Sequence, residues 1–267
     1  MQHSTGYIIG FCAAVCVVCA LFVSGSAVSL KDRQDRNALV DKQKNILSVA
    51  GLMADGDDLS PGQVQTLFQE KIRPRVVDLA SGEDATDVDP TAYDQRLAAK
   101  DPATSRQAPD NPAKVLRVPT DGLVYEVVEN GVVQSIILPI EGMGLWSIMY
   151  GYIALDPDLT TIRGITYYEQ GETAGLGGEV ENPRWKALWP GRKAFDDRGN
   201  VKIRVKKGPA GPPDQDPYQV DGLSGATLTS RGVTHMLQFW LGDNGFGPYI
   251  ARLREDRPAS GTKTKGA

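Results

Sequence analysis

The hydrophobic and polar positions divide the chain into an apolar start, a charged helical stretch and a region of short alternating runs. Residues 7–28 include no charged side chain, and these 22 residues are enough to cross a hydrocarbon core of about 30 Å as a helix. Residues 31–51 then mix charged and apolar positions, which predicts an amphipathic continuation of the helix that Gly51 breaks. We expect a tail over residues 1–6, a transmembrane helix over 7–29 and a helical and irregular connecting region over 30–114.

A cleavable signal peptide is the alternative interpretation of the apolar segment. The residues "SGSA" at 24–27 resemble a small-residue cleavage site, but no Lys or Arg precedes the apolar run, as one usually does in a signal peptide. We therefore predict a retained anchor. Lys31, Arg33 and Arg36 follow the anchor, so the positive-inside rule taken alone predicts that the bulk of the chain lies in the cytoplasm.

The rest of the chain predicts an α+β domain. Ser60 followed by Pro61 is typical of a helix start, whereas residues 81–114 are polar and predict irregular structure. From residue 115 onward, β-rich runs follow one another, the first two joined at "ENG", a hairpin signal. Residues 184–194 then predict a helix and residues 201–208 a strand, and helical spacing recurs after Thr227. We expect a mostly antiparallel sheet with flanking helices over residues 115–255, and a flexible tail over 256–267.

Composition narrows the chemistry. The three cysteines, Cys12, Cys16 and Cys19, lie along one stripe of the apolar helix, where they are packing residues or, alternatively, take a metal or redox role within the bilayer. Beyond them the chain has no thiol for a disulfide or an iron–sulfur centre. The two histidines, His3 and His235, cannot build a histidine-rich metal site, and the net charge of −4 does not indicate a nucleic-acid-binding protein.

The stretch "DGLSGATLTSRG" from Asp221 to Gly232 concentrates hydroxyl groups on a glycine-rich turn that leads into a helix. The unpaired N–H groups and the dipole at a helix start favour a negative charge, so a phosphate would fit there. The alternative is that Ser224, Thr227 and Thr229 serve as ordinary N-caps.

Two further glycine-rich stretches precede this one. "GETAGLGG" at residues 171–178 holds four glycines and predicts a loop whose backbone lies close to a flat partner, or an ordinary surface loop. In "EGMGLWSIMYGY", Gly142 and Gly144 precede Trp146, which we expect on a strand, either in the core or beside a cofactor.

Together these three stretches resemble the family of domains that bind FMN covalently, and within it the C subunits of bacterial Na⁺-translocating NADH:quinone reductases. Residues 221–227 match the family's attachment motif, D-G-x-S/T-G/S-A-T, throughout. The family's loop "ETPGLG" is present as Glu172 to Gly177, with Ala174 in place of proline. The segment from Gly144 to Asp156 and the single N-terminal anchor resemble these C subunits more than the related Rnf-type subunit, and the resemblance covers essentially the whole chain.

The resemblance implies that FMN is joined by a phosphoester to Thr227, and that a separate, Mg²⁺-dependent flavin transferase attaches it from FAD. It implies that Asp221 shapes the turn or aids that transfer. The ring and ribityl chain would then be bordered by residues of all three stretches and by a cation. The residues implied are Trp146, Glu172, Thr173, Leu176, Gly177, Ser224, Gly225 and Ala226. A cation near the ring would stabilise the reduced, anionic flavin by Coulomb attraction, and Lys206 or Lys207 is the candidate for it; the alternative is that these lysines lie on a solvated strand edge.

The implied function is electron relay inside a multi-subunit membrane complex that carries electrons from NADH to quinone and pumps Na⁺. The chain itself shows no G-x-G-x-x-G between a strand and a helix, so we expect no NADH site and no complete active site in it. The family places the flavin domain in the periplasm, against the Lys/Arg bias. A Rnf-type electron-transfer subunit, a protein that binds a phosphorylated ligand non-covalently, and a structural assembly subunit are the alternatives.

Overall fold

The computed structural model describes residues 4–54 and 56–256. The chain divides into two compact units, Met1–Gln43 and Lys44–Ala267. Helix α1, Thr5–Val49, contributes to both, and its apolar part is long and hydrophobic enough to cross a membrane. The predicted anchor and the amphipathic stretch are therefore one continuous helix. Gly51, which has φ +72°, follows its end as predicted.

The second unit is built on a five-stranded sheet in the order β1-β4-β5-β6-β7, in which every neighbouring pair is antiparallel. This confirms the predicted α+β class. The β4–β5 turn is the expected Asn-Gly hairpin, and Asn130 and Gly131 both have positive φ, at 51° and 77°. The strands are β1 (Ile72–Asp78), β4 (Asp121–Glu129), β5 (Val132–Met143), β6 (Ile148–Leu155) and β7 (Ile162–Glu169).

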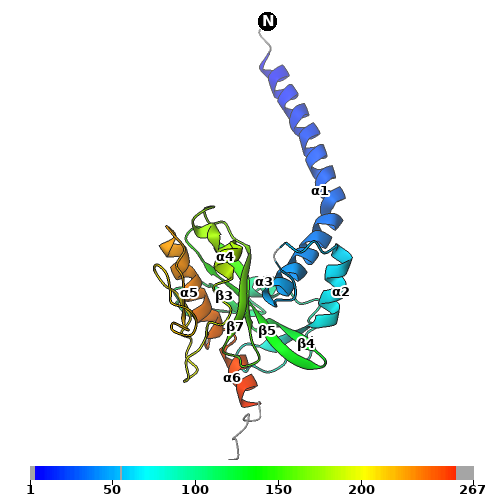
Figure 1. Cartoon of the computed structure of the whole chain (residues 1–267). Helices are drawn as coiled ribbons and strands as arrows, with labels where there is room; N and C mark the ends of the chain where they lie inside the picture. The colour runs from blue at the N-terminus through cyan, green and yellow to red at the C-terminus, as the bar shows by residue number, and fades with distance from the viewer. Residues whose placement is uncertain (1–3, 55, 257–267) are drawn as a thin grey trace, which may run out of the picture. The chain divides into compact units, whose positions relative to one another are not determined.

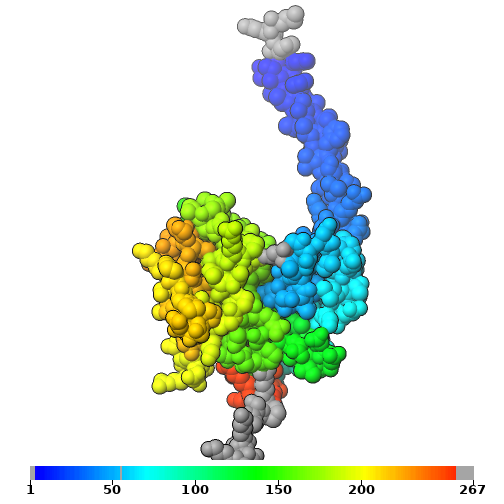
Figure 2. Space-filling view, in the orientation of Figure 1, coloured from blue at the N-terminus to red at the C-terminus, as the bar shows by residue number. Residues whose placement is uncertain are grey.

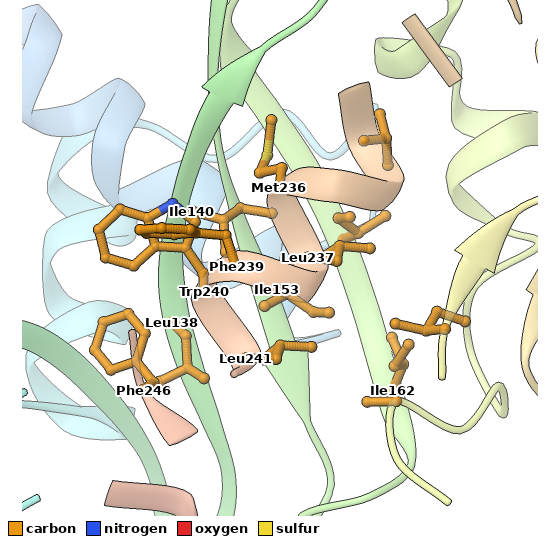
Figure 3. Close-up of a cluster of buried hydrophobic side chains, with 14 of the residues drawn as sticks. Leu138, Ile140, Ile153, Ile162, Met236, Leu237, Phe239, Trp240, Leu241 and Phe246 are labelled. Atoms are coloured by element: carbon orange, nitrogen blue, oxygen red, sulfur yellow. The ribbon is translucent and has the colours of Figure 1, made fainter. Parts of the chain in front are cut away.

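One face of the sheet packs against α5, Thr227–Leu241, to form the main core. Figure 3 shows Met236, Leu237 and Trp240 of α5 directed toward side chains of the strands. The indole N–H of Trp240 donates to the Glu141 carbonyl of β5 at 2.7 Å, so its one polar atom is satisfied within the core. The helical spacing in the sequence therefore identifies the buried face of α5.

The opposite face of the sheet bears tyrosines, and α2, Pro61–Lys71, packs over β1 and β4 on this face (Figure 1). The Phe68 ring of α2 lies 6.3 Å from the Tyr125 ring, which in turn lies 6.1 Å from the Tyr152 ring. As predicted, Ser60 caps α2, and with Gln63 it forms a capping box.

Shorter elements complete the unit. They are α3 (Gln95–Lys100), β2 (Ser105–Gln107), β3 (Arg117–Pro119), the 3₁₀ helix η1 (Gly177–Glu181), α4 (Pro183–Lys186), β8 (Arg204–Val205), β9 (Gln219–Val220) and α6 (Gly247–Glu255).

Four expectations differ from this architecture. The connecting region over 30–114 contains an unpredicted sheet strand, β1, and the irregular stretch over 81–114 contains α3 and β2. The helical and strand patterns expected after residues 184 and 201 shrink to α4 and β8, because most of that segment forms turns. Trp146 is not on a strand: it lies in the loop between β5 and β6.

Candidate functional site

The hydroxyl groups of the motif at residues 221–232 differ sharply in exposure. Thr229 and Ser230 are buried, at 1% and 4% exposure, and both are engaged: Thr229 Oγ1 donates to Glu172 at 2.6 Å, and Ser230 Oγ accepts from the Leu223 N–H. Ser224 and Thr227 are exposed. Two hydroxyls of the motif are therefore available to an external partner.

None of these hydroxyls caps the helix. Helix α5 begins at Thr227 with Ala226 as N-cap residue, and no side chain accepts from the N–H groups of its first turn. The interpretation of Ser224, Thr227 and Thr229 as N-caps is therefore wrong. The first turn contributes no acidic residue of its own; the carboxylate that reaches it is that of Glu172, which accepts from the Thr229 hydroxyl.

Three cationic residues line the same cavity as Thr227. Lys206, Lys207, Thr227 and Arg231 line one cavity of about 180 Å³, beside the exposed start of α5. Figure 2 shows the segment near residue 200 and the start of α5 gathered on one side of the domain. Lys206 lies 3.8 Å from Asp216, while the structure pairs neither Lys207 nor Arg231 with a carboxylate among the residues it describes. The cavity suits an anion.

The glycines of the motif allow the close approach of two segments. A Cβ at Gly222 would lie 2.3 Å from the Lys206 carbonyl oxygen, so a side chain there would push the lysine segment away from the motif. Gly225 has φ +71°, and a Cβ there would lie 2.9 Å from Leu176. The site therefore requires glycine at both positions. At Gly222 the reason is the close contact, and at Gly225 it is the close contact together with the positive φ.

The carboxylate of Glu172 joins the other two glycine-rich stretches to α5. It accepts from three consecutive backbone N–H groups, those of Leu145, Trp146 and Ser147, at 2.8–3.2 Å, and from the Thr229 hydroxyl. Successive N–H groups directed at one point form an anion-binding nest, which here holds the protein's own carboxylate. Glu172 thereby fixes the β5–β6 loop against the start of α5.

Hydrogen bonding keeps Glu172 ionised. Burial of the carboxyl opposes ionisation, but the hydrogen bonds from the Thr229 hydroxyl and the three backbone N–H groups outweigh it, and the pKa of Glu172 lies below its ordinary value. The expected contact between Glu172 and a flavin stays a prediction, because the donors around its carboxylate are groups of the protein.

Large apolar side chains are exposed beside the clamp that the Glu172 carboxylate forms between the β5–β6 loop and α5. Trp146 is 69% exposed, Leu228 is 50% exposed and Leu176 is 42% exposed. Trp146 is itself one of the residues whose N–H groups bind Glu172, and Leu228 lies next to Thr227 on α5. The interpretation of Trp146 as a core residue is wrong. An exposed apolar surface next to a cationic cavity fits a ligand with a flat ring and a phosphate.

Close backbone contact between α5 and the β5–β6 loop leads to a stability prediction. A Cβ at Gly232 would lie 2.4 Å from the Met143 carbonyl oxygen, so we expect Gly232→Ala to destabilise the fold by about 3 kcal/mol. Gly62 on α2 has open space and a negative φ, and Gly62→Ala should change stability by less than about 1 kcal/mol, in the stabilising direction. Urea unfolding of the two variants checks this; equal effects would contradict it.

The structure brings most of the predicted site residues into two adjoining groups. Lys206, Lys207 and Thr227 line the cation-rich cavity, while Leu176 lies against Gly225 and Glu172 binds the loop of Trp146. The remaining predicted residues occupy the turns between them: Asp221 accepts from the Ala210 N–H at 2.9 Å, Thr173 and Ser224 are exposed, and Gly177 and Ala226 are buried.

Sequence reasoning missed two residues of the site. Arg231 lies four positions after Thr227, a spacing that places both on one face of a helix and is visible in the sequence. The role of Thr229 as donor to Glu172 had no such signal, because the two residues are 57 positions apart.

The fold and the site are those of an FMN-binding domain preceded by a helix that is long and apolar enough to cross a membrane. In agreement, residues 144–242 match the family model described as FMN-binding domain. The chain is 49% identical to the C subunit of the Na⁺-translocating NADH-quinone reductase of Vibrio vulnificus, covering 92% of this chain and 94% of that protein. It is 45% identical to the C subunit of the same enzyme of Pseudomonas aeruginosa, covering 95% and 98%.

A solved structure agrees with these relatives. The crystal structure of NqrC from Shewanella oneidensis superposes with a TM-score of 0.74 at 35% identity, covering 84% of this chain and 99% of that one. The chain belongs to the family formed by the C subunits of the Na⁺-translocating NADH-quinone reductases.

Proposed function

We propose that this chain carries FMN covalently on Thr227 and relays electrons through it as a subunit of a Na⁺-translocating NADH-quinone reductase. The observation that carries the proposal is the position of Thr227: it is an exposed hydroxyl of the motif that also lines a cavity with Lys206, Lys207 and Arg231. Ser224 is the other exposed hydroxyl, and it does not line that cavity. Bound FMN would supply the capacity to accept and pass on single electrons.

The residues around Thr227 fit a phosphate that is joined to two carbon chains. Such a phosphate keeps one negative charge, while three cationic side chains line the cavity. The charge in excess would act on the ring, favouring its reduced, anionic form by Coulomb attraction. Trp146, Leu176 and Leu228 would cover the ring. Burial of their exposed apolar area against it would favour binding.

We assign attachment to a separate flavin transferase. That enzyme would supply the base that takes the Thr227 hydroxyl proton, so this chain does not need one. In the proposed reaction the Thr227 oxygen forms a bond to the FMN phosphorus of FAD, and the pyrophosphate bond breaks so that AMP leaves. The hydroxyl proton passes to a base of the transferase. Asp221 accepts from the Ala210 N–H and so holds the turn that presents Thr227.

We place the flavin domain in the periplasm, following the resemblance, with α1 as the retained anchor. Lys31, Arg33 and Arg36 argue for the opposite orientation, but charge bias is a weak signal for a single span with few flanking charges. The electrons would come from, and go to, partner subunits, because the chain has no NADH-binding fingerprint.

Acid denaturation tests the covalent flavin. The full-length protein is expressed with and without a flavin transferase, denatured in acid and separated from small molecules. We expect flavin absorbance to stay with the polypeptide in the first sample, and the peptide containing Thr227 to gain the mass of FMN minus water. Release of all flavin from the polypeptide would instead support a non-covalent phosphate-ligand site, and the absence of any flavin would support an assembly role.

A further inference from the structure

A second cavity, of about 350 Å³, lies at the sheet end on the face opposite α5. Its floor is formed by Glu141 and Tyr150 of β5 and β6, and its walls by α3 and by residues 114–117. The cavity has the size of a small ligand pocket, and neither Thr227 nor any lysine of the flavin site lines it.

The cavity is apolar inside and open to a partner. Leu116 and Ile148 line it and are 76% and 44% exposed, although both are large apolar side chains. Burial raises the pKa of Glu141 on the floor, while the charges of Arg96 and Lys100 act in the opposite direction. The interior therefore suits an apolar group.

The rim carries four cationic residues, against which stand the carboxyl groups of Glu141 and Glu169 near Arg96 and Lys100. Arg96 is paired with Glu169 at 2.6 Å and stacks over the Tyr150 ring, and Arg117 donates to Ser105. For Lys100 and Lys114, by contrast, the described part of the chain offers no ion pair. An excess of positive charge at this place stands out in a chain whose net charge is −4.

Lys114 is held at the rim by a strained backbone. Its φ is +56°, which is uncommon for a residue with a side chain. The Asn111 side chain fixes the next residue, Val115, because it accepts from the Val115 N–H and donates to the Val115 carbonyl. The same segment is tied to the flavin side of the domain, because the Met143 N–H donates to the Ala113 carbonyl at 2.8 Å. Met143 is the last residue of β5, directly before the loop that carries Trp146.

We propose that this cavity is the docking site for a segment of a partner subunit, one that inserts a large apolar side chain between α3 and β6 and presents carboxylates to Lys100 and Lys114. Charge complementarity favours an acidic segment, and the shared β5–β6 loop would bring that partner close to the proposed flavin. The inference rests on the proposed function, because electron relay requires an adjacent redox partner. The cavity and its charges, however, do not depend on flavin attachment.

The test uses the complete complex, expressed with all its subunits and with an affinity tag on this chain. Lys100→Glu combined with Lys114→Glu reverses the rim, and Ala99→Leu fills the cavity without a change in charge. As matched control, Lys193→Glu combined with Arg198→Glu makes the same charge change at exposed residues that do not line the cavity. Covalent flavin per chain is measured in every sample.

We expect both cavity variants to weaken retention of the partner subunits by roughly tenfold or more, with unchanged flavin content, while the control retains them. We expect retention by the parent to fall as salt is raised, and the rim variant should lose this salt dependence. Full retention in both cavity variants would overturn the proposal. A second outcome would also overturn it: the detergent-solubilised chain binds anionic lipid vesicles, the rim variant abolishes this binding, and partner retention is unchanged. The occupant of the cavity would then be a lipid. Loss of flavin in all samples would instead contradict the proposed function.

Discussion

Thr227→Ala is expected to remove all covalent flavin from the protein while leaving the fold intact. Thr227 is exposed and its side chain makes no hydrogen bond that caps α5, so the substitution removes the attachment oxygen and little else. Coexpression with a flavin transferase, followed by intact-mass measurement, should give the unmodified mass for Thr227→Ala. Thr227→Ser retains a hydroxyl at the same position and should recover at least part of the modification.

Two controls separate this effect from damage to the motif. Ser224→Ala removes the other exposed hydroxyl and should retain covalent flavin, because Ser224 does not line the cation-rich cavity. Thr229→Val removes a buried hydroxyl of the same residue type two positions away, and it too should retain a modified Thr227. A flavinylated Thr227→Ala protein, or loss of flavin from folded Ser224→Ala, would contradict the assignment.

The parts of the fold that depend on local chemistry could be predicted from the sequence. The capping box of Ser60 and Gln63, the Asn130–Gly131 hairpin and the apolar face of α5 are each determined by residues close together in the chain. Strand β1 was missed because Pro74 and two arginines make "IRPRVVD" a poor strand pattern. In the structure β1 is an edge strand, where a proline that cannot donate is tolerated.

The site divides in the same way. The motif around Thr227 is local and could be found in the sequence, together with the four-residue spacing to Arg231. The environment of Glu172 could not, because its four donors come from two segments at least 25 positions away. Its contact with a flavin stays a prediction, and the structure shows in addition that its carboxylate binds the backbone of the β5–β6 loop. A buried carboxylate can bind N–H groups that are distant in the chain, and the spacing of residues in the sequence does not predict such a contact.

The second large effect concerns that clamp. We expect Glu172→Ala to destabilise the protein by about 3 kcal/mol or more, because three backbone N–H groups and the Thr229 hydroxyl lose a charged acceptor together. Glu172→Gln keeps the shape: its carbonyl oxygen accepts from the N–H groups and its amide donates to Thr229, so about 1–2 kcal/mol should be lost. Trp146 emission should shift in Glu172→Ala, since its loop is released.

The pH dependence distinguishes the charge of Glu172 from its shape. The folded pKa of Glu172 lies below its unfolded value of about 4.3, so its contribution to stability is complete above that value and disappears as the pH falls through the folded pKa. The parent should therefore lose more stability than Glu172→Gln when unfolding is measured at decreasing pH below about 4.3, and the two curves should converge. Parallel curves for the two proteins would show that the buried carboxylate is not what holds the loop. In that case the shape of the side chain, which glutamine shares, would be sufficient to join the β5–β6 loop to α5.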